Sequence, residues 1–130
     1  MSKITRFEDL ECWQEARKLV QEVYKICRNS NFKKDFRLVG QIQGAAISTM
    51  ANIPEGFIRK STKEFIQFLF ISLSSDAEVQ SHLYVALDQE YITMEEFERV
   101  FDQANKTAMI TSGLIKYLRK ISTKQTKQTK

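Results

Sequence analysis

The chain has 130 residues, enough for one domain with a hydrophobic core of its own. Its hydrophobic fraction of 42% is ordinary for a soluble globular protein, and a net charge of +4 does not by itself indicate a partner. No apolar run is long enough to span a bilayer and the first residues lack a signal peptide's apolar core, so we expect a cytoplasmic protein without a membrane role. One proline and four glycines leave few turns for a β-rich fold, which favours an all-α fold.

The first helix is expected over residues 8–28. Apolar residues recur there at steps of three, four and seven, which makes a wide apolar face typical of a bundle helix. Thr5 and Glu8 fit a capping box at its start, although the helix could begin later. Cys12 and Cys27 lie too far apart along one helix to form a disulfide, so we expect two reduced cysteines.

The second helix is expected over residues 33–53, at the centre of a bundle. Its apolar residues form one stripe, and small residues beside that stripe would let another backbone come close. Pro54 has no amide hydrogen, so we expect the helix to kink or stop there. Gly56 is then expected to adopt the left-handed conformation that often ends a helix.

The third helix is expected over residues 62–90, opened by a capping box of Ser61 and Glu64. Its first half is apolar on almost every side, whereas a helix of a small monomeric bundle buries only one stripe. We therefore expect a second subunit to pack against it, with coverage by loops as the alternative. The candidate interface residues are Phe65, Ile66, Phe68, Leu69, Phe70, Ile71 and Leu73. Polar residues that interrupt this helix are interpreted as a polar seam or channel in the assembly: Ser72, Ser74, Ser75, Asp76 and Glu78.

The fourth helix is expected over residues 94–121, opened by a second capping box of Thr93 and Glu96. Residues 122–130 repeat Thr-Lys-Gln and contain nothing to bury, so we expect a disordered basic tail after a domain of residues 1–121. Short connections between four helices imply antiparallel neighbours. The predicted architecture is thus an up-down-up-down antiparallel four-helix bundle.

In this topology the chain termini and the connection between the second and third helices share one end of the bundle. Basic residues gather at that end, and a basic surface attracts phosphate backbones without reading sequence. A solvated surface with a solubilising tail is the alternative. The candidate nucleic-acid-binding residues are Lys3, Arg6, Arg59, Lys60, Lys63, Lys116, Arg119 and Lys120. At the opposite end, basic residues of the first connection are expected to be neutralised by acids around the second.

Catalytic and metal-binding chemistry finds no support in the residues. His82 is the only histidine, and with Glu78 it makes a single i, i+4 pair. A di-iron bundle needs two such histidines and carboxylates from four helices, and two distant cysteines do not make a zinc site. We expect no enzyme activity, no metal and no cofactor, and interpret His82 as a partly buried core or interface residue.

Five segments resemble one family. They are FEDLECWQEA (7–16), QIQGAAIS (41–48), NIPEG (52–56), STKEFIQFL (61–69) and EYI (90–92). They resemble the small bacterial four-helix-bundle proteins encoded in intervening sequences of 23S rRNA genes, also called the S23 ribosomal protein family. The accessory variability proteins of diversity-generating retroelements are similar in fold. The family-motif residues are Asn52, Ile53, Glu55 and Gly56. Two positions depart from the family pattern: Gln43-Gly44 replaces a basic pair, and Pro54 replaces the usual alanine.

The resemblance implies a ring-like homopentamer without known enzymatic activity and with a suspected role in binding RNA, DNA or a nucleic-acid enzyme. Together with the basic end, it leads to one hypothesis: a non-catalytic homo-oligomeric protein that binds nucleic acid, RNA above all. The alternative is a scaffold that docks another protein, such as a reverse transcriptase or an rRNA-associated factor. The apolar third helix and the missing basic pair at Gln43-Gly44 favour that alternative.

Overall fold

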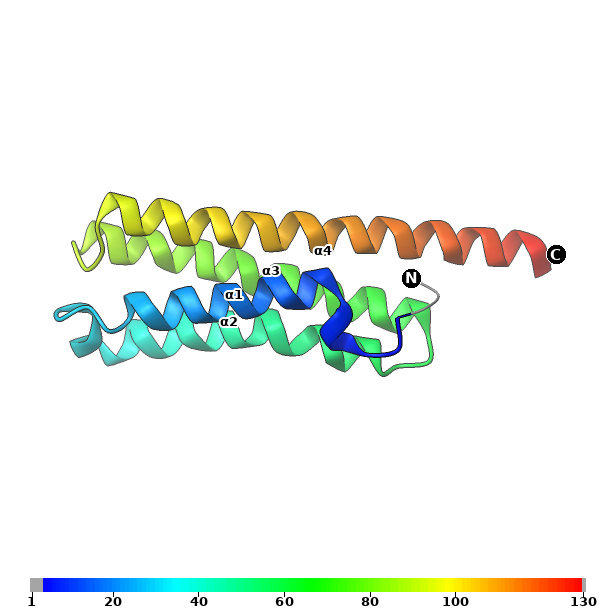
Figure 1. Ribbon diagram of the computed structural model, residues 1–130, viewed down its shortest axis with the longest axis horizontal. Helices are drawn as coiled ribbons and strands as arrows, with labels where there is room; N and C mark the ends of the chain where they lie inside the picture. Colours follow the sequence, from blue (N-terminus) through cyan, green and yellow to red (C-terminus); the bar gives the residue numbers. More distant parts are fainter. Residues whose placement is uncertain (1–3, 130) are drawn as a thin grey trace.

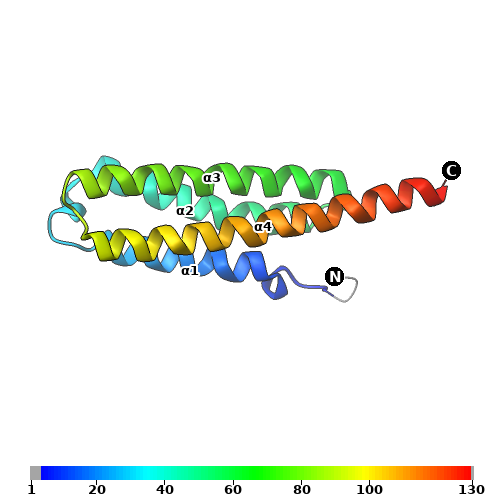
Figure 2. The same cartoon turned by 90° about the horizontal axis from the view of Figure 1, so that it is seen from above.

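The structure, a computed structural model, describes residues 4–129 and the side chains of residues 4–123. In that part of the chain every regular element is helical, and four long helices run antiparallel as one bundle (Figures 1 and 2). The predicted all-α four-helix fold is therefore confirmed. The helices are α1 (Glu11–Ile26), α2 (Phe36–Phe57), α3 (Thr62–Asp88) and α4 (Met94–Thr129), with short 3-10 turns η1 (Phe7–Asp9) and η2 (Phe32–Lys34).

The bundle has two ends with different contents (Figure 1). The α1–α2 and α3–α4 connections form one end, which we call the loop end. The α2–α3 connection lies at the other, the terminal end, together with the start of α1 and the stretch of α4 that leaves the bundle. This arrangement is the one that the up-down-up-down topology predicts.

Local sequence explains where most of the helices begin. The Thr93 hydroxyl accepts from the Glu96 amide (3.0 Å) and the Glu96 carboxylate accepts from the Thr93 amide (2.9 Å), which confirms the predicted capping box. Ser61 Oγ likewise accepts from the Glu64 amide (3.2 Å). The capping box expected at Thr5 and Glu8 is wrong, because the Glu8 carboxylate pairs with Arg6 instead (2.9 Å). Helix α1 consequently begins at Glu11, after η1.

Helix α2 continues through Pro54 to Phe57, so the predicted stop at the proline is wrong. Only one turn follows Pro54, so its missing amide removes a single hydrogen bond near a helix end, and its carbonyl still accepts from the Ile58 amide (3.1 Å). No glycine among the described residues has a positive φ, so Gly56 is not the expected left-handed residue. Instead, a Cβ atom on Gly56 would lie 2.7 Å from Phe68 Cβ and 2.9 Å from Phe65 Cδ1. Gly56 therefore lets α2 and α3 approach closely.

Helix α4 is longer than predicted. It runs to Thr129, beyond the ends of the other three helices, where we expected a disordered tail from residue 122 (Figure 2). A helix that is already formed adds one hydrogen bond per residue without a new nucleation cost, and Lys and Gln are good helix formers. Lys130 lies outside the described residues.

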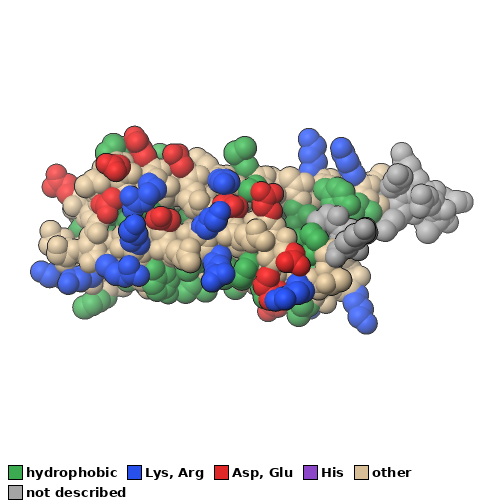
Figure 3. Space-filling view, viewed as in Figure 1, with side chains coloured by type: hydrophobic (Ala, Val, Ile, Leu, Met, Phe, Trp, Pro, Cys, Tyr) green, Lys and Arg blue, Asp and Glu red, His purple; other side chains and the backbone are tan. Residues whose placement is uncertain are grey.

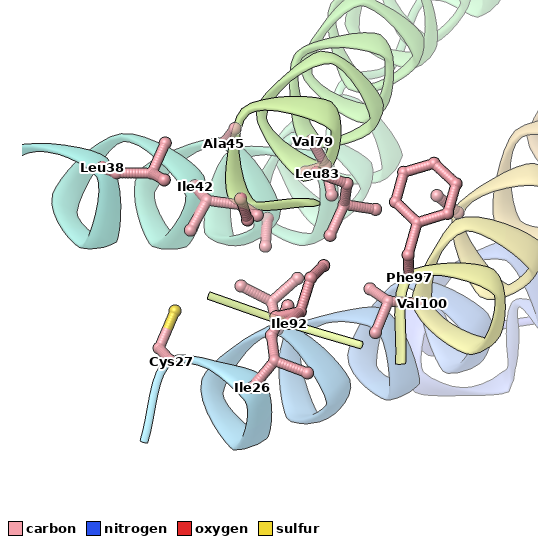
Figure 4. Close-up of a cluster of buried hydrophobic side chains, with 14 of the residues drawn as sticks. Ile26, Cys27, Leu38, Ile42, Ala45, Val79, Leu83, Ile92, Phe97 and Val100 are labelled. Atoms are coloured by element: carbon pink, nitrogen blue, oxygen red, sulfur yellow. The ribbon is translucent and has the colours of Figure 1, made fainter. Parts of the chain in front are cut away.

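The core consists of two hydrophobic clusters along the bundle axis. The loop-end cluster draws side chains from all four helices (Figure 4), and its larger members include Leu19, Phe32, Ile42, Leu83 and Val100. The terminal-end cluster is smaller, and its members are Leu10, Cys12, Ala16, Ile53, Phe65, Leu69, Ile115 and Leu118.

A layer of buried polar residues lies between the two clusters along α2, α3 and α4, and on α1 Glu15 lies beside Ala16 of the terminal-end cluster. Its members, which we call the polar layer, are Glu15, Thr49, Ser72, Ser75, Asp76, Thr107 and Thr111. Most of them are satisfied within the chain, as when Ser72 Oγ donates to the Thr49 carbonyl (2.6 Å). The seam predicted in the assembly is therefore wrong for Ser72, Ser75 and Asp76, which are buried inside their own bundle. The helical period placed them on the inner face, together with Val79.

Candidate nucleic-acid interface

The terminal end holds most of the cations that the sequence singled out. Figure 3 shows Lys and Arg side chains at the end of the bundle from which α4 extends, with a few acidic side chains near them, and a mixture of acidic and basic side chains toward the opposite end. Lys3 lies outside the described residues. Arg6 is exposed, but its guanidinium pairs with Glu8 at 2.9 Å, so its charge is largely neutralised. The remaining candidates fall into two groups, one beside the α2–α3 connection and one on α4.

The first group follows the end of α2. Arg59 Nε donates to the Glu55 carbonyl (3.4 Å), and its guanidinium carbon lies 5.0 Å from the centre of the Phe68 ring. Its Nη1 is 4.0 Å from Glu64 Oε1, a long contact between exposed groups that neutralises little. Lys60 and Lys63 are exposed and form no ion pair with another described residue.

The second group lies on the last part of α4 that packs against α3. Lys116, Arg119 and Lys120 are exposed, and none forms an ion pair within the described part of the chain. The Arg119 guanidinium carbon lies 5.2 Å from the centre of the Phe70 ring on α3, within cation–π range. A groove of about 370 Å³ opens here between the two helices. Its lining residues are Phe70, Leu73, Ser112, Ile115, Lys116 and Arg119.

The two basic groups flank α3 from opposite sides. Phe68 and Phe70 are two residues apart on one helix, so their side chains point in directions about 200° apart. Arg59 covers the first from the α2 side, and Arg119 covers the second from the α4 side. The structure thus brings the α4 cations and the α2–α3 connection to one end, as predicted, but on two faces rather than in one cluster.

The loop end differs from what we expected. Arg28, Lys33, Lys34 and Arg37 share it with the acids around the α3–α4 connection, yet none of these cations forms an ion pair with a described acid. The Glu96 carboxylate instead accepts from Asn29 Nδ2 (3.1 Å) and caps α4. Acidic and basic side chains therefore lie near one another at this end, but these four cations form no ion pair with a described acid.

The predicted oligomer-interface residues on α3 separate into three classes. Phe65 and Leu69 belong to the terminal-end cluster and are not available to another subunit, because α2 approaches them closely at Gly56. Ile66, Phe68 and Leu73 are half-buried. Phe70 and Ile71 remain exposed, at 42% and 47% of their surface, and are the members of the set that can still meet a partner.

Burial and hydrogen bonds shift the pKa values of titratable groups in the core in different directions. Burial raises the pKa of Cys12 to about 12 and that of Cys27 to about 11, so both thiols stay protonated at neutral pH. The hydrogen bond that Gln103 donates to Glu15 outweighs burial and lowers the pKa of that carboxyl. His82 is half-buried, with a buried Nε2 that has no partner among the described residues. Within the described residues no three His, Cys, Asp or Glu side chains converge as a metal site.

Two features of the site escaped the sequence analysis. The α3–α4 groove was missed because Phe70 was assigned to a subunit interface and the α4 cations were treated as surface charge alone. Ser112, Lys116 and Arg119 recur at steps of four and three, which marks one polar stripe on α4 beside the buried Ile115. That spacing was the feature of the sequence from which the groove could have been predicted. The second feature, close contact at Gly56, has no signal in a single sequence.

No helix of the described part of the chain is both long and apolar enough to cross a membrane. Residues 8–113 match the family model described as 23S rRNA-intervening sequence protein. A similar solved structure is the crystal structure of a protein of unknown function from the S23 ribosomal protein family of Bacteroides thetaiotaomicron. It is 26% identical in sequence with a TM-score of 0.74, and the match covers 81% of this chain and 98% of that one. Among curated proteins there is no match.

Proposed function

The chain belongs to the family of 23S rRNA-intervening sequence proteins, and from this premise we propose that it is a cytoplasmic, non-catalytic, homo-oligomeric protein that binds RNA through its terminal end. Membership confirms the resemblance seen in its motifs. The observation that carries RNA binding is a set of exposed terminal-end cations without a carboxylate partner among the described residues. The set comprises Lys60, Lys63, Lys116, Arg119 and Lys120.

Unpaired cations suit a polyanion better than a protein surface. Each one that contacts a phosphate releases condensed counterions, so affinity falls steeply with salt and scales with the number of contacts. We therefore expect electrostatic attraction to phosphates to supply most of the affinity for RNA.

Oligomerisation is proposed from the outer face of α2 and α3. Ile47 and Ile71 are 44% and 47% exposed there. A shallow groove of about 230 Å³ between the same two helices is lined by small residues, including Gly40, Gly44 and Ser75, beside Gln41 and Glu78. Small residues permit close helix approach, and exposed apolar side chains gain from burial. A ring, with five copies as the family resemblance implies, would gather the basic terminal ends on one face and multiply their field.

RNA binding is tested on the full chain by fluorescence anisotropy with a structured rRNA fragment over a salt series. Replacing Lys63, Lys116 and Lys120 by Gln should weaken binding at least 10-fold at low salt. It should also make the slope of log affinity against log salt shallower by about 2, because three phosphate contacts are lost. The matched control replaces Lys33, Lys34 and Arg37 at the loop end by Gln and removes the same charge.

The control variant should bind like the wild type. Equal weakening by both variants would show that net charge, and not the terminal end, drives binding. A third variant with Lys124, Lys127 and Lys130 replaced by Gln separates the contribution of the last residues of the chain. If the wild-type chain binds no RNA at low salt, the RNA-binding proposal is wrong and the adaptor hypothesis takes its place.

The oligomer is tested by light scattering on the full chain. Ile71→Glu should reduce the assembly mass to that of one subunit, because a charge would be buried between copies. Met109→Glu introduces the same charge at a side chain that is 74% exposed on α4 and should leave the mass unchanged. A wild-type mass of one subunit would contradict the proposal.

A further inference from the structure

The groove between α3 and α4 at the terminal end combines an apolar floor with a cationic rim. Leu73 and Ile115 form the floor, of which Ile115 is only 4% exposed. Phe70 forms one wall with 42% of its surface free. Lys116 and Arg119 line the α4 side of the groove, and the Arg119 guanidinium lies over the Phe70 ring, 5.2 Å from its centre. The groove, at about 370 Å³, is open and of the size that holds a small ligand.

Both walls of the groove lack acidic residues. On α3 no Asp or Glu occurs between Glu64 and Asp76, and on α4 none occurs after Asp102. Lys116 and Arg119 consequently have no carboxylate partner among the described residues. An occupant that brings negative charge would gain two charge-assisted contacts here, and one that brings a flat apolar face would cover the exposed Phe70 ring.

We propose that this groove takes one unpaired nucleotide of single-stranded RNA, whose base replaces the Arg119 guanidinium on the Phe70 ring while Lys116 and the released Arg119 hold a neighbouring phosphate. This inference rests on the proposed RNA-binding function and names the form of RNA that the site prefers. Base stacking on an aromatic side chain tolerates every base, because every base has a π-face. Phosphate contacts and stacking together are the usual means by which proteins bind single strands.

Two other occupants fit the groove less well. A duplex presents phosphates but keeps its base faces stacked within the helix, so it can use the two cations and not Phe70. A second copy of this chain that met the groove with this same face would bring more cations against Lys116 and Arg119. Burying those charges without acids would cost more than covering Phe70 gains. The charge of the groove thus favours a nucleotide over a contact with the same face of a second copy.

The test uses the full chain and two fluorescent RNAs of one sequence, a single-stranded 12-mer and its blunt duplex, in anisotropy titrations. Phe70→Leu keeps an apolar side chain in the groove and removes the aromatic face. It should weaken single-strand binding about 10-fold, within the range seen when a stacking aromatic is lost, and leave duplex binding and the salt slope unchanged. Phe36→Leu changes an 83% exposed ring on α2 at the loop end and should leave both unchanged.

A second variant tests the rim. Replacing Lys116 and Arg119 by Gln should weaken binding of both RNAs and make the salt slope shallower. If the wild type binds RNA but Phe70→Leu binds the single strand as tightly as before, the groove proposal is overturned and RNA binding by the terminal end stands. If Phe70→Leu instead lowers the assembly mass in light scattering, Phe70 is a subunit contact and the groove proposal is likewise overturned. If the wild type binds neither RNA, both proposals are wrong.

Discussion

The two ends of the bundle use similar residues for different purposes. At the loop end the Phe32 ring is fully buried and stacks on Tyr91, with ring centres 5.3 Å apart. The Tyr91 hydroxyl donates to Asp35 Oδ2 (2.9 Å), and Asn29 Nδ2 donates to the Tyr91 carbonyl (3.1 Å). These contacts tie the α1–α2 connection to the α3–α4 connection, so each loop holds the other in place.

At the terminal end two aromatic residues of α3, Phe68 and Phe70, stay near the surface. Phe68 and Phe70 lie beneath Arg59 and Arg119, and the cations above them are not tied to carboxylates at short range. Among the described residues no hydrogen bond joins the α2–α3 connection to residues 4–10. The comparison teaches that an aromatic residue serves stability where it is buried in a cluster closed by hydrogen bonds between loops, and can meet a ligand where only a mobile cationic side chain lies over it.

The largest expected effect comes from truncating one aromatic residue at each end. Phe32→Ala should lower the free energy of unfolding by about 3–5 kcal/mol, because it leaves a cavity beneath Tyr91. Phe70→Ala should cost less than about 1 kcal/mol, because Phe70 is 42% exposed and its removal leaves no enclosed cavity. Urea denaturation of both variants measures the difference. Equal losses of unfolding free energy in the two variants would mean that Phe32 and Phe70 are packed equally tightly.

A smaller effect is expected from the polar layer that separates the ends. Burial, opposed in part by the hydrogen bond from Gln80, raises the pKa of Asp76 to about 7, and its Oδ2 has no partner among the described residues. An unfolded Asp releases its proton near pH 4. Between pH 4 and pH 7 the folded chain therefore binds more protons than the unfolded chain, so stability is highest below this interval, falls as pH rises through it, and stays low above it.

This pH dependence is checked by urea denaturation of Asp76→Asn beside the wild type. Asn cannot ionise, so the stability of the variant relative to the wild type should rise by roughly 2–3 kcal/mol between pH 5 and pH 8, at about 1.4 kcal/mol per pH unit. A constant difference across that range would show that Asp76 does not titrate there. A charge in the layer at high pH weakens the connection between the two clusters.

The smallest of the three effects concerns helix approach at the terminal end. Gly→Ala inside a helix ordinarily stabilises by about 0.5–1 kcal/mol. At Gly56 the new Cβ atom would meet Phe68 Cβ at 2.7 Å, so α2 and α3 must separate and Gly56→Ala should destabilise by about 1–2 kcal/mol. Gly113→Ala on α4 has nothing within 4 Å and should stabilise instead. Thermal unfolding of the two variants shows directly whether each substitution raises or lowers the stability of the protein. A stabilised Gly56→Ala variant would show that the helices are not in close contact there.

Much of the fold was predictable because it depends on local patterns. The period of the apolar residues identified four helices, and Thr93 with Glu96 marked the start of one of them. Short connections then left one antiparallel topology, which places the candidate cations at one end. The errors at the start of α1 and at Pro54 arose where a local signal competes with another group, as when Glu8 pairs with Arg6 instead of capping.

What the sequence by itself determined is therefore the helices, their order and the end of the bundle at which Lys60, Lys63 and Lys116 gather. Tertiary structure alone decided that Gly56 is a point of close approach, that Asp76 is buried with an unpaired oxygen, and that Phe70 lies beside Arg119. The physical reason is that periodicity encodes which face of a helix is buried, whereas these features depend on the distance to a neighbouring helix. That distance is set by the packing of all four helices together.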